Sequence, residues 1–352
     1  MLKLNSYGIT GDLYGWIKSF LSNRTQAVKL DGCLSSVIAI LSGVPQGSVL
    51  GPILFVLFIN DLVDCFKNLA VSTKLFADDL KLYTSYGLTD SSCDLTEALH
   101  RVTVWAKKWQ LTINSTKCNV LRIVNPRCKN KSDIVYDLNG SSLKVLSVVK
   151  DLGVAVDKNL RFDNHISSVV HKSLQRANLI LKCFQSRDRS LLMKAFKVYV
   201  RPLLEYATPV WSPHFMYLIL KIEHVQRSFT KRLFGLKNLT YIDRLKQLEI
   251  DTLEHRRLIY DLCTCFKIIH GYNDTCLDMN RMHLEGRPNN TRGHNLKLAK
   301  EMCRTDMLRF FFCNRICTVW NSLPLDVVNA PSVNSFKKRV TKFNLDRFLT
   351  LK

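Results

Sequence analysis

The stretch "VLGPILFVLFINDL", residues 49–62, is the most apolar in the chain and the one that most restricts its fold. A helix needs roughly 20 apolar residues to cross a bilayer, so this run is too short to span a membrane. It contains Gly51-Pro52 near its start, and proline is well tolerated in the first turn of a helix. We therefore expect a buried core helix at this position, inside a globular domain.

A second constraining pattern is "STKLFADDLKLYTS", residues 72–85, which predicts a strand, a tight turn and a second strand. Asp78 and Asp79 stand side by side at the tip. Favoured two-residue hairpin turns use Asn-Gly or Asp-Gly, so a glycine-free turn with two repelling carboxylates is unusual. Two interpretations stay open on these residues alone. Acids are ordinary turn residues, so the pair is a solvated turn, or else a group of opposite charge binds there.

The remaining patterns divide the chain into two halves. Residues 24–40 predict two strands around a tight turn, residues 91–109 an amphipathic helix, and residues 141–160 further short strands. Beyond about residue 162 the pattern is helical almost to the end. These patterns predict a mixed first half, an all-helical second half and a boundary near residue 160.

The charge of the chain indicates its class of partner. Its 352 residues include 51 Lys and Arg against 29 Asp and Glu, a formal net charge of +22, and 47% are hydrophobic. That hydrophobic content excludes a disordered chain. Because the basic excess is spread along the sequence, we expect a surface that faces a polyanion. Nucleic acid is the first candidate and an anionic membrane surface the second, while a merely basic soluble protein remains possible.

The twelve cysteines are irregularly spaced among apolar residues, and the N-terminus lacks the apolar region of a secretory signal. We expect reduced cysteines in an intracellular protein, in the nucleus or the cytoplasm. Cys263, Cys265, His270 and Cys276 come nearest to a zinc site. One residue separates the first pair, where zinc sites use two to four, and the segment also predicts an amphipathic helix closed by Gly271. No structural zinc is expected.

Three glycines and two prolines precede and open the apolar helix in "LSGVPQGSVLGPILFVLFINDL", residues 41–62. Glycine lets a backbone approach a ligand closely, and a helix N-terminus offers unpaired N–H groups. A structural turn that happens to be rich in glycine explains the same residues.

Taken with "KLFADDLKLY", this stretch resembles the reverse transcriptase domain of LINE-type (non-LTR) retrotransposons, nearest to the jockey and chicken-repeat-like groups. "SGVPQGSVLGPILFVLFINDL" matches motif B of that family and "KLFADDLKLY" matches motif C. "WQLTINSTKCNVLRIV" resembles motif D, and "VVKDLGVAVDKNLRFDNHI" resembles motif E. "VYVRPLLEYATPVWSP" and later stretches are similar to the helical region that follows in these elements, so the resemblance covers nearly the whole chain.

The resemblance implies an α+β fold. It predicts a partial right-hand polymerase palm, with an antiparallel sheet and packed helices, followed by an all-helical thumb and C-terminal region. Residues 1–160 would be partial fingers and palm with motifs B to E, residues 161–270 a helical thumb-like region, and residues 271–352 a helical C-terminal region.

The resemblance also implies a reaction, RNA-directed DNA synthesis by nucleotidyl transfer with two Mg²⁺ (or Mn²⁺) ions. The partners would be an RNA template, a DNA primer and dNTP, with no membrane. Asp78 matches the metal ligand of motif C, and Asp79 is its partner in a weaker role. Lys117 matches the motif D lysine that protonates or neutralises the leaving pyrophosphate, and a solvated lysine at a strand end is its alternative.

Two further groups of residues follow from the same comparison. A loop against the incoming nucleotide and the templating base would consist of Gly43, Pro45, Gln46 and Gly47. The motif E strand region would grip the primer end, which makes Leu152 and Gly153 candidates for contacts without chemistry.

One departure from the family pattern concerns motif A, which carries another metal-binding aspartate and lies upstream of "LLxKLxxYGI". The sequence begins at "MLKL", and the acids before motif B, Asp12 and Asp31, do not match motif A. We expect the N-terminally truncated chain alone to be inactive or nearly so, because removing a metal ligand costs orders of magnitude in rate. The alternative is a non-enzymatic, nucleic-acid-binding remnant. A related polymerase, such as an intron-encoded enzyme, is disfavoured by "SGVPQGSVLGPILF".

Overall fold

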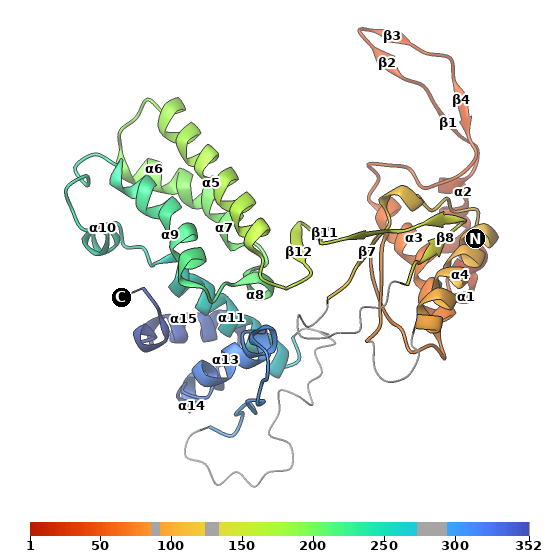
Figure 1. Ribbon diagram of the computed structural model, residues 1–352. Coiled ribbons are helices and arrows are strands. Elements are labelled where there is room, and N and C mark those ends of the chain that lie inside the picture. Colours follow the sequence, from red (N-terminus) through yellow and green to blue (C-terminus); the bar gives the residue numbers. More distant parts are fainter. Residues whose placement is uncertain (86–91, 124–133, 273–293, 352) are drawn as a thin grey trace. The chain divides into compact units, whose positions relative to one another are not determined.

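The computed structural model describes residues 1–85, 92–123, 134–272 and 294–351 (Figure 1). The chain divides into two compact units. The first comprises residues 1–120 and 129–145, and the second comprises residues 121–128 and 146–352. Each unit is described by itself.

The first unit combines short strands with helices. Its helices are α1 (Leu2–Ser6), α2 (Gly11–Leu21), α3 (Leu50–Ile59), the 3₁₀ segment η1 (Asn60–Phe66), α4 (Ser92–Lys108) and the 3₁₀ segment η2 (Ser115–Lys117). Its strands are β1 (Arg24–Gln26), β2 (Lys29–Leu30), β3 (Cys33–Leu34), β4 (Ile38–Ile40), β5 (Ser72–Phe76), β6 (Asp79–Tyr83), β7 (Asn119–Leu121), β8 (Asp137–Leu138), β9 (Ser141–Ser142) and β10 (Lys144–Leu146).

Residues 24–40 form the predicted hairpin, in which β1 pairs with β4 and, farther out, β2 pairs with β3. The turn at its end is Asp31-Gly32, and both residues have positive φ angles, 48° and 86°. This is the combination that a two-residue hairpin turn favours. The hairpin extends away from the helices of this unit as an arm (Figure 1).

The apolar stretch forms α3 as predicted, but its burial is one-sided. Gly51, Leu54 and Ile59 are buried, whereas Ile53 is 55% and Val56 is 49% exposed. The expected core helix therefore contributes to the core along one face, and its other face is exposed in the part of the chain that the structure describes. The reason is that the neighbours of α3 there, which include α1 and η1, cover only one face of it.

Lys3 fixes α1 to the rest of the first unit through a cage of aromatic rings. Its Nζ lies 4.4, 4.5 and 3.9 Å from the ring centroids of Phe58, Trp105 and Trp109. The ammonium also forms an ion pair with Asp61 at 2.6 Å and donates to the Phe58 carbonyl. Burial lowers the pKa of Lys3, against the opposing pull of Asp61.

The described residues of the second unit are helical apart from one hairpin, in agreement with the sequence pattern. Its elements are β11 (Val148–Asp151), β12 (Val154–Asp157), α5 (Asp163–Cys183), α6 (Arg189–Ala195), the π-helical η3 (Phe196–Val200), α7 (Arg201–Glu205), α8 (Thr208–Trp211), α9 (Met216–Lys231), α10 (Tyr241–Leu248), α11 (Leu253–Ile269), α12 (Asp306–Arg309), α13 (Phe312–Trp320), α14 (Leu325–Val328), α15 (Val333–Lys342) and η5 (Asp346–Phe348). Because β12 packs on α5, this hairpin belongs to the helical unit. The predicted functional boundaries at residues 160 and 270 stay predictions.

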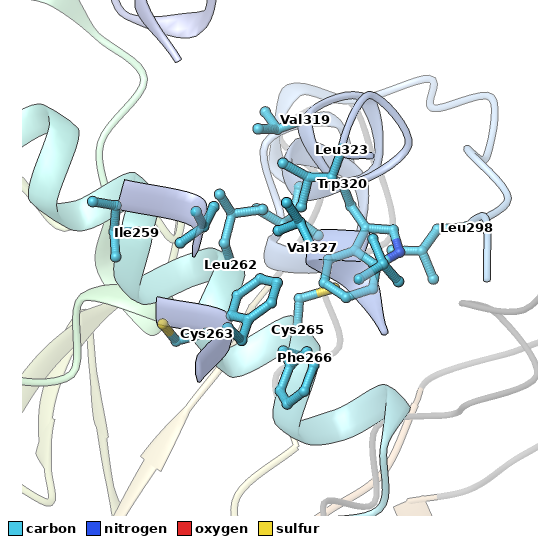
Figure 2. Packing of buried hydrophobic residues seen from close by; sticks show 14 of the residues in the cluster. Ile259, Leu262, Cys263, Cys265, Phe266, Leu298, Val319, Trp320, Leu323 and Val327 are labelled. Carbon is cyan, nitrogen blue, oxygen red and sulfur yellow. The ribbon is translucent and has the colours of Figure 1, made fainter. Parts of the chain in front are cut away.

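Two hydrophobic cores hold the second unit together. One lies between α5 and α9, where Ile166, Phe196 and Ile222 are fully buried. The other lies between α11, α13 and α15, and Figure 2 shows Phe266 and Trp320 within it.

The cysteines fit these cores as apolar side chains. Cys263 and Cys265 lie in the α11 core (Figure 2), and burial raises the pKa of both thiols. The cysteines of the described ranges are free thiols, as expected. No group of three or more potential metal ligands occurs among the described residues. Cys276 of the weighed zinc cluster lies outside them, so the expectation of no zinc stays a prediction.

Two absences bear on the wider expectations. Each strand ladder in the described ranges is two-stranded, so the antiparallel palm sheet stays a prediction. No helix within those ranges has the length and apolar character needed to span a membrane.

Candidate functional site

The aspartate pair lies at the tip of a regular hairpin. Strands β5 and β6 pair so that Leu75 is opposite Leu80 and Phe76 is opposite Asp79, which leaves Ala77 and Asp78 as a two-residue turn. Ala77 has a φ of 51°, in the left-handed region. This angle answers the question raised by the glycine-free turn, because an alanine supplies the positive φ that such turns need. An L-residue in this conformation costs roughly 1–2 kcal/mol, and strain of this kind clusters at functional sites.

One face of the β5–β6 hairpin packs against the core of the first unit. Leu75, Leu80 and Leu82 pack on the core formed by η1 and α4, next to buried Leu62 and Trp105. Strand alternation therefore places Asp79 on the opposite face. The carboxylates of Asp78 and Asp79 are both exposed, and neither forms a hydrogen bond or an ion pair within the described residues. The two charges are thus without a counter-cation from this part of the protein.

The donor set suits a hard divalent cation in part. Carboxylate oxygens are the ligands that Mg²⁺ prefers, and Mg²⁺ sites commonly use one or two carboxylates together with substrate phosphates. Asp78 and Asp79 provide two such groups. A third carboxylate does not join them in the described ranges, since no group of three potential ligands is found there.

The glycine-rich loop before α3 is fastened to the start of that helix. The Ser48 hydroxyl donates to the Pro45 carbonyl at 2.7 Å and accepts the Gly51 N–H at 3.0 Å. A side chain at Gly51 would place its Cβ 2.7 Å from the Pro45 oxygen, so the loop can close only over a glycine. Arg24 also donates to the Gly43 carbonyl at 2.5 Å, which fastens the other end of the loop.

The predicted nucleotide-binding residues lie on the open side of this loop. Gly43 and Gly47 have φ angles of 81° and 79°, and no atom lies within 4 Å of a Cβ built on either. Gln46 is exposed and Pro45 is half-buried. The backbone here leaves room for a ligand, and the loop leads directly into the N-terminus of α3. Its role in binding nucleotide stays a prediction.

Lys117 ends the short η2 segment, where the Asn114 side chain accepts the Thr116 N–H at 3.1 Å. Its side chain is exposed and has no ion-pair partner among the described residues. Ile113, on one side of η2, packs against the core beneath the Asp78–Asp79 hairpin and also against a second core that contains Tyr136. One framework in the first unit therefore carries the aspartates and Lys117.

Leu152 and Gly153 form the turn of the β11–β12 hairpin, in the second unit. Their φ angles are 42° and 88°, as a type I′ turn requires. The Tyr206 hydroxyl donates to the Leu152 carbonyl at 2.8 Å, and a Cβ on Gly153 would lie 3.3 Å from the Tyr206 ring. These primer-grip candidates belong to the second unit and the aspartates to the first, and the primer-grip role stays a prediction.

Sequence patterns missed three residues that shape these sites. Ala77 carries the strained angle, Gly51 permits the loop to close, and Tyr206 anchors the β11–β12 turn. The glycine in "LGP" was a signal for the second. For Ala77 and Tyr206 no local pattern distinguishes the residue from its neighbours.

Comparisons with known proteins agree on one family. Residues 2–156 match the family model of reverse transcriptase (RNA-dependent DNA polymerase). The RNA-directed DNA polymerase from mobile element jockey of Drosophila funebris is 33% identical over 238 residues, which cover 64% of this chain and 25% of the relative. The probable RNA-directed DNA polymerase from transposon BS of Drosophila melanogaster is 31% identical, over 56% of this chain and 23% of the relative.

These relatives are much longer proteins. The chain spans about a quarter of the length of these curated relatives. An uncharacterized protein of Caenorhabditis elegans is 32% identical over 35% of this chain and 64% of that protein.

Proposed function

We propose that this chain, whose residues 2–156 are a reverse transcriptase domain of the non-LTR (LINE-type) retrotransposon family, serves RNA-directed DNA synthesis. The observation that carries the proposal is the hairpin tip, where Asp78 and Asp79 present two exposed carboxylates that have no counter-ion among the described residues. The strained Ala77 next to them supports a functional role for the turn.

In this proposal each part of the first unit has a task. Asp78 is the chief ligand of a divalent ion, Mg²⁺ or Mn²⁺, and Asp79 assists it. When bound, such ions clamp the attacking 3′-oxygen of the primer and the leaving pyrophosphate. Gly43, Pro45, Gln46 and Gly47 lie against the dNTP and the templating base, and Lys117 neutralises the pyrophosphate.

The second unit has a binding task. Residues 161–270 form a thumb-like region that follows the backbone of the RNA–DNA duplex through phosphate contacts, which give affinity without sequence specificity. The turn at Leu152 and Gly153 supports the primer end, held by Tyr206. Residues 271–352 complete the helical C-terminal region.

Metal binding tests the aspartate pair directly. We expect the purified chain to bind Mn²⁺ weakly, as measured by the loss of the free-ion signal in electron paramagnetic resonance, and the Asp78→Asn variant to lose most of that binding. Asp31→Asn is the matched control, because Asp31 also occupies a hairpin turn of the first unit. Equal binding by the wild type and Asp78→Asn would overturn the proposed metal site.

Primer extension tests the chemistry. With two carboxylates and no third ligand among the described residues, the 352-residue chain by itself should extend a DNA primer on an RNA template at a rate near background. The assay contains dNTP with Mg²⁺ or Mn²⁺. Robust extension that Asp78→Asn abolishes would contradict the expected inactivity while supporting the polymerase assignment.

A further inference from the structure

Two arginines contact one tyrosine ring in the second unit. Tyr241 begins α10, and its ring centroid lies 4.7 Å from the Cζ of Arg227 on α9 and 5.5 Å from the Cζ of Arg244 on α10. The Tyr241 hydroxyl donates to Glu223, and it accepts a hydrogen bond from Gln226 at 3.0 Å. The ring is therefore fixed, and both guanidinium groups lie within 5.5 Å of its centroid.

The guanidinium groups lack acceptors. Nε of Arg227 and both Nε and Nη1 of Arg244 are buried without a hydrogen-bond partner. Neither side chain forms an ion pair with any described residue. Buried donors without acceptors are costly in proteins, so an acceptor from outside these residues would stabilise the pair.

The neighbouring carboxylates are engaged elsewhere. Glu223 is fully buried, and its oxygens accept the Tyr241 hydroxyl and the Leu253 N–H, the latter at 3.0 and 3.1 Å. Burial raises the pKa of Glu223, although the Tyr241 hydroxyl and the Leu253 N–H oppose the change. Asp243 is exposed and bonded to the Thr240 hydroxyl at 2.6 Å. Burial, and then the charge of Arg227, lower the pKa of Arg244, as expected for two cations that share no carboxylate.

The surrounding helices add positive charge. Residues 216–248, which cover α9, the connecting loop and α10 (Figure 1), contain seven lysines and arginines but only two acids, Glu223 and Asp243. The local field therefore attracts an anion to the place where the unpaired guanidinium donors lie.

We propose that Arg227, Tyr241 and Arg244 form a binding site for a phosphate group of a nucleic-acid backbone. The forked guanidinium donors match phosphate oxygens, and two of them around a fixed ring bind such a group better than a single lysine does. The choice of nucleic acid as the source rests on the proposed function, while the anion site rests on the contacts above.

Duplex binding at several salt concentrations tests this site. The full chain is titrated into a fluorescein-labelled RNA–DNA duplex, and the affinity is read from anisotropy. We expect Arg227→Gln/Arg244→Gln to bind about 10-fold more weakly. The slope of log affinity against log salt should fall by about 1 for each lost phosphate contact. Arg227→Lys/Arg244→Lys should keep most of the salt slope but lose part of the affinity, because the charge remains and the fork does not.

The matched control removes two charges elsewhere in the same unit. Lys338 and Lys342 are exposed on α15 and have no ion-pair partner among the described residues, so Lys338→Gln/Lys342→Gln equals the test variant in net charge. A smaller effect of this control supports the site, whereas an equal effect overturns it. Thermal unfolding of each variant shows that the chain is still folded, and the lysine double variant keeps the test decisive if the glutamine double variant unfolds.

Separate arms distinguish the source of the phosphate. Inorganic phosphate and dATP are titrated alone, with detection by isothermal calorimetry, and vesicles containing phosphatidylserine are tested by co-sedimentation. If the double variant loses binding to inorganic phosphate, dATP or vesicles but binds the duplex like the wild type, the nucleic-acid site is wrong. No catalysis enters these assays, so failure of primer extension leaves their outcome unaffected.

Discussion

The backbone conformation of Ala77 shapes the turn at the proposed metal site. Its φ of 51° forms the turn that presents Asp78 and Asp79, at a place where glycine is the ordinary choice. The cost of this angle is balanced by the packing of Leu75 and Leu80 on the core beneath. The left-handed backbone of Ala77 is therefore stabilised by the packing around the turn and not by the conformational preference of alanine.

Ala77→Gly should therefore stabilise the first unit. We expect the free energy of unfolding to rise by up to about 1 kcal/mol, because relief of the left-handed strain is partly offset by the larger backbone entropy of glycine. Urea unfolding followed by tryptophan fluorescence measures the change. Gly153→Ala is the opposite case, because it adds a Cβ at a φ of 88° and 3.3 Å from the Tyr206 ring. A stability loss in Ala77→Gly would contradict the assignment of strain.

For single residues, the sequence predicted which residues form a turn better than it predicted their backbone angles. The Asp31-Gly32 turn could be predicted because glycine and aspartate favour it locally. The positive φ of Ala77 could not, because nothing in an alanine indicates it. The unpaired donors of Arg227 and Arg244 could not be predicted either, because the sequence does not show which acceptors lie near a side chain after folding.

Among the elements, a buried ion pair ties three helices of the second unit together. Asp261 on α11 accepts from the Nε and Nη2 atoms of Arg315 on α13, at 2.9 and 3.0 Å. Nη2 also donates to the carbonyl of Pro209, in α8, at 2.7 Å. Burial raises the pKa of Asp261 even though Arg315 opposes the change.

Asp261→Asn should weaken this junction strongly. The variant leaves a mostly buried guanidinium without its counter-charge, which costs about 3 kcal/mol of unfolding free energy. Urea unfolding followed through the buried Trp320 measures the loss. Asp163→Asn provides the comparison, because its ion pair with Arg161 is well exposed and should contribute less than about 1 kcal/mol. Equal losses of unfolding free energy in the two variants would show that the buried ion pair stabilises the fold no more than the exposed one.

Elements could be predicted well where a pattern repeats along the chain. The period of Ile166, Val170 and Ala177 gives α5 its buried stripe, and strand alternation gives the hairpin at Asp78 its inward face. The exposed side of α3 could not be predicted. The helix carries apolar residues on every face, so periodicity cannot show which face packs against other elements. The contact of Tyr206 with Leu152 joins residues 54 positions apart, beyond the reach of any local pattern.

For the whole molecule, buried histidines link stability to pH. His165 accepts the Ala155 N–H at its Nδ1, 3.2 Å away, so a proton on that nitrogen would face a donor. Burial, and to a lesser extent Lys172, lower the pKa of His165 below its ordinary value of 6.5. Burial also lowers the pKa values of His214 and His294.

The sign of this effect follows from proton binding. Below pH 6.5 the unfolded chain takes up protons at these histidines while the folded chain does not, so the stability they contribute is complete above that pH and is lost as pH falls. Glu223 and Asp261, with raised pKa values, act in the opposite direction. The difference between wild type and His165→Gln isolates one histidine.

We expect the melting temperature of wild type to fall more steeply than that of His165→Gln between about pH 7 and pH 5. Differential scanning fluorimetry across this range measures both curves. Parallel curves would mean that His165 takes up its proton equally in the folded and unfolded chains.

The division of the molecule into a mixed unit and a helical unit could be predicted from the change of periodicity along the chain. The assignment of residues 148–157 to the second unit could not be predicted. These strands resemble the first half of the chain in sequence, yet β12 packs on α5. The family could be predicted from motifs B and C, because long motifs with glycine, proline and acids at set positions rarely arise by chance. The palm sheet and the primer contacts of the β11–β12 turn stay predictions.

The caged Lys3 has an optical consequence for the two units. Of the five tryptophans, Trp105 and Trp109 in the first unit face an ammonium group within 4.5 Å of their ring centroids, and Trp211 and Trp320 in the second unit lie in apolar cores. The indoles of the two units therefore lie in different surroundings, so the tryptophan fluorescence of the protein reports on unfolding without an added dye.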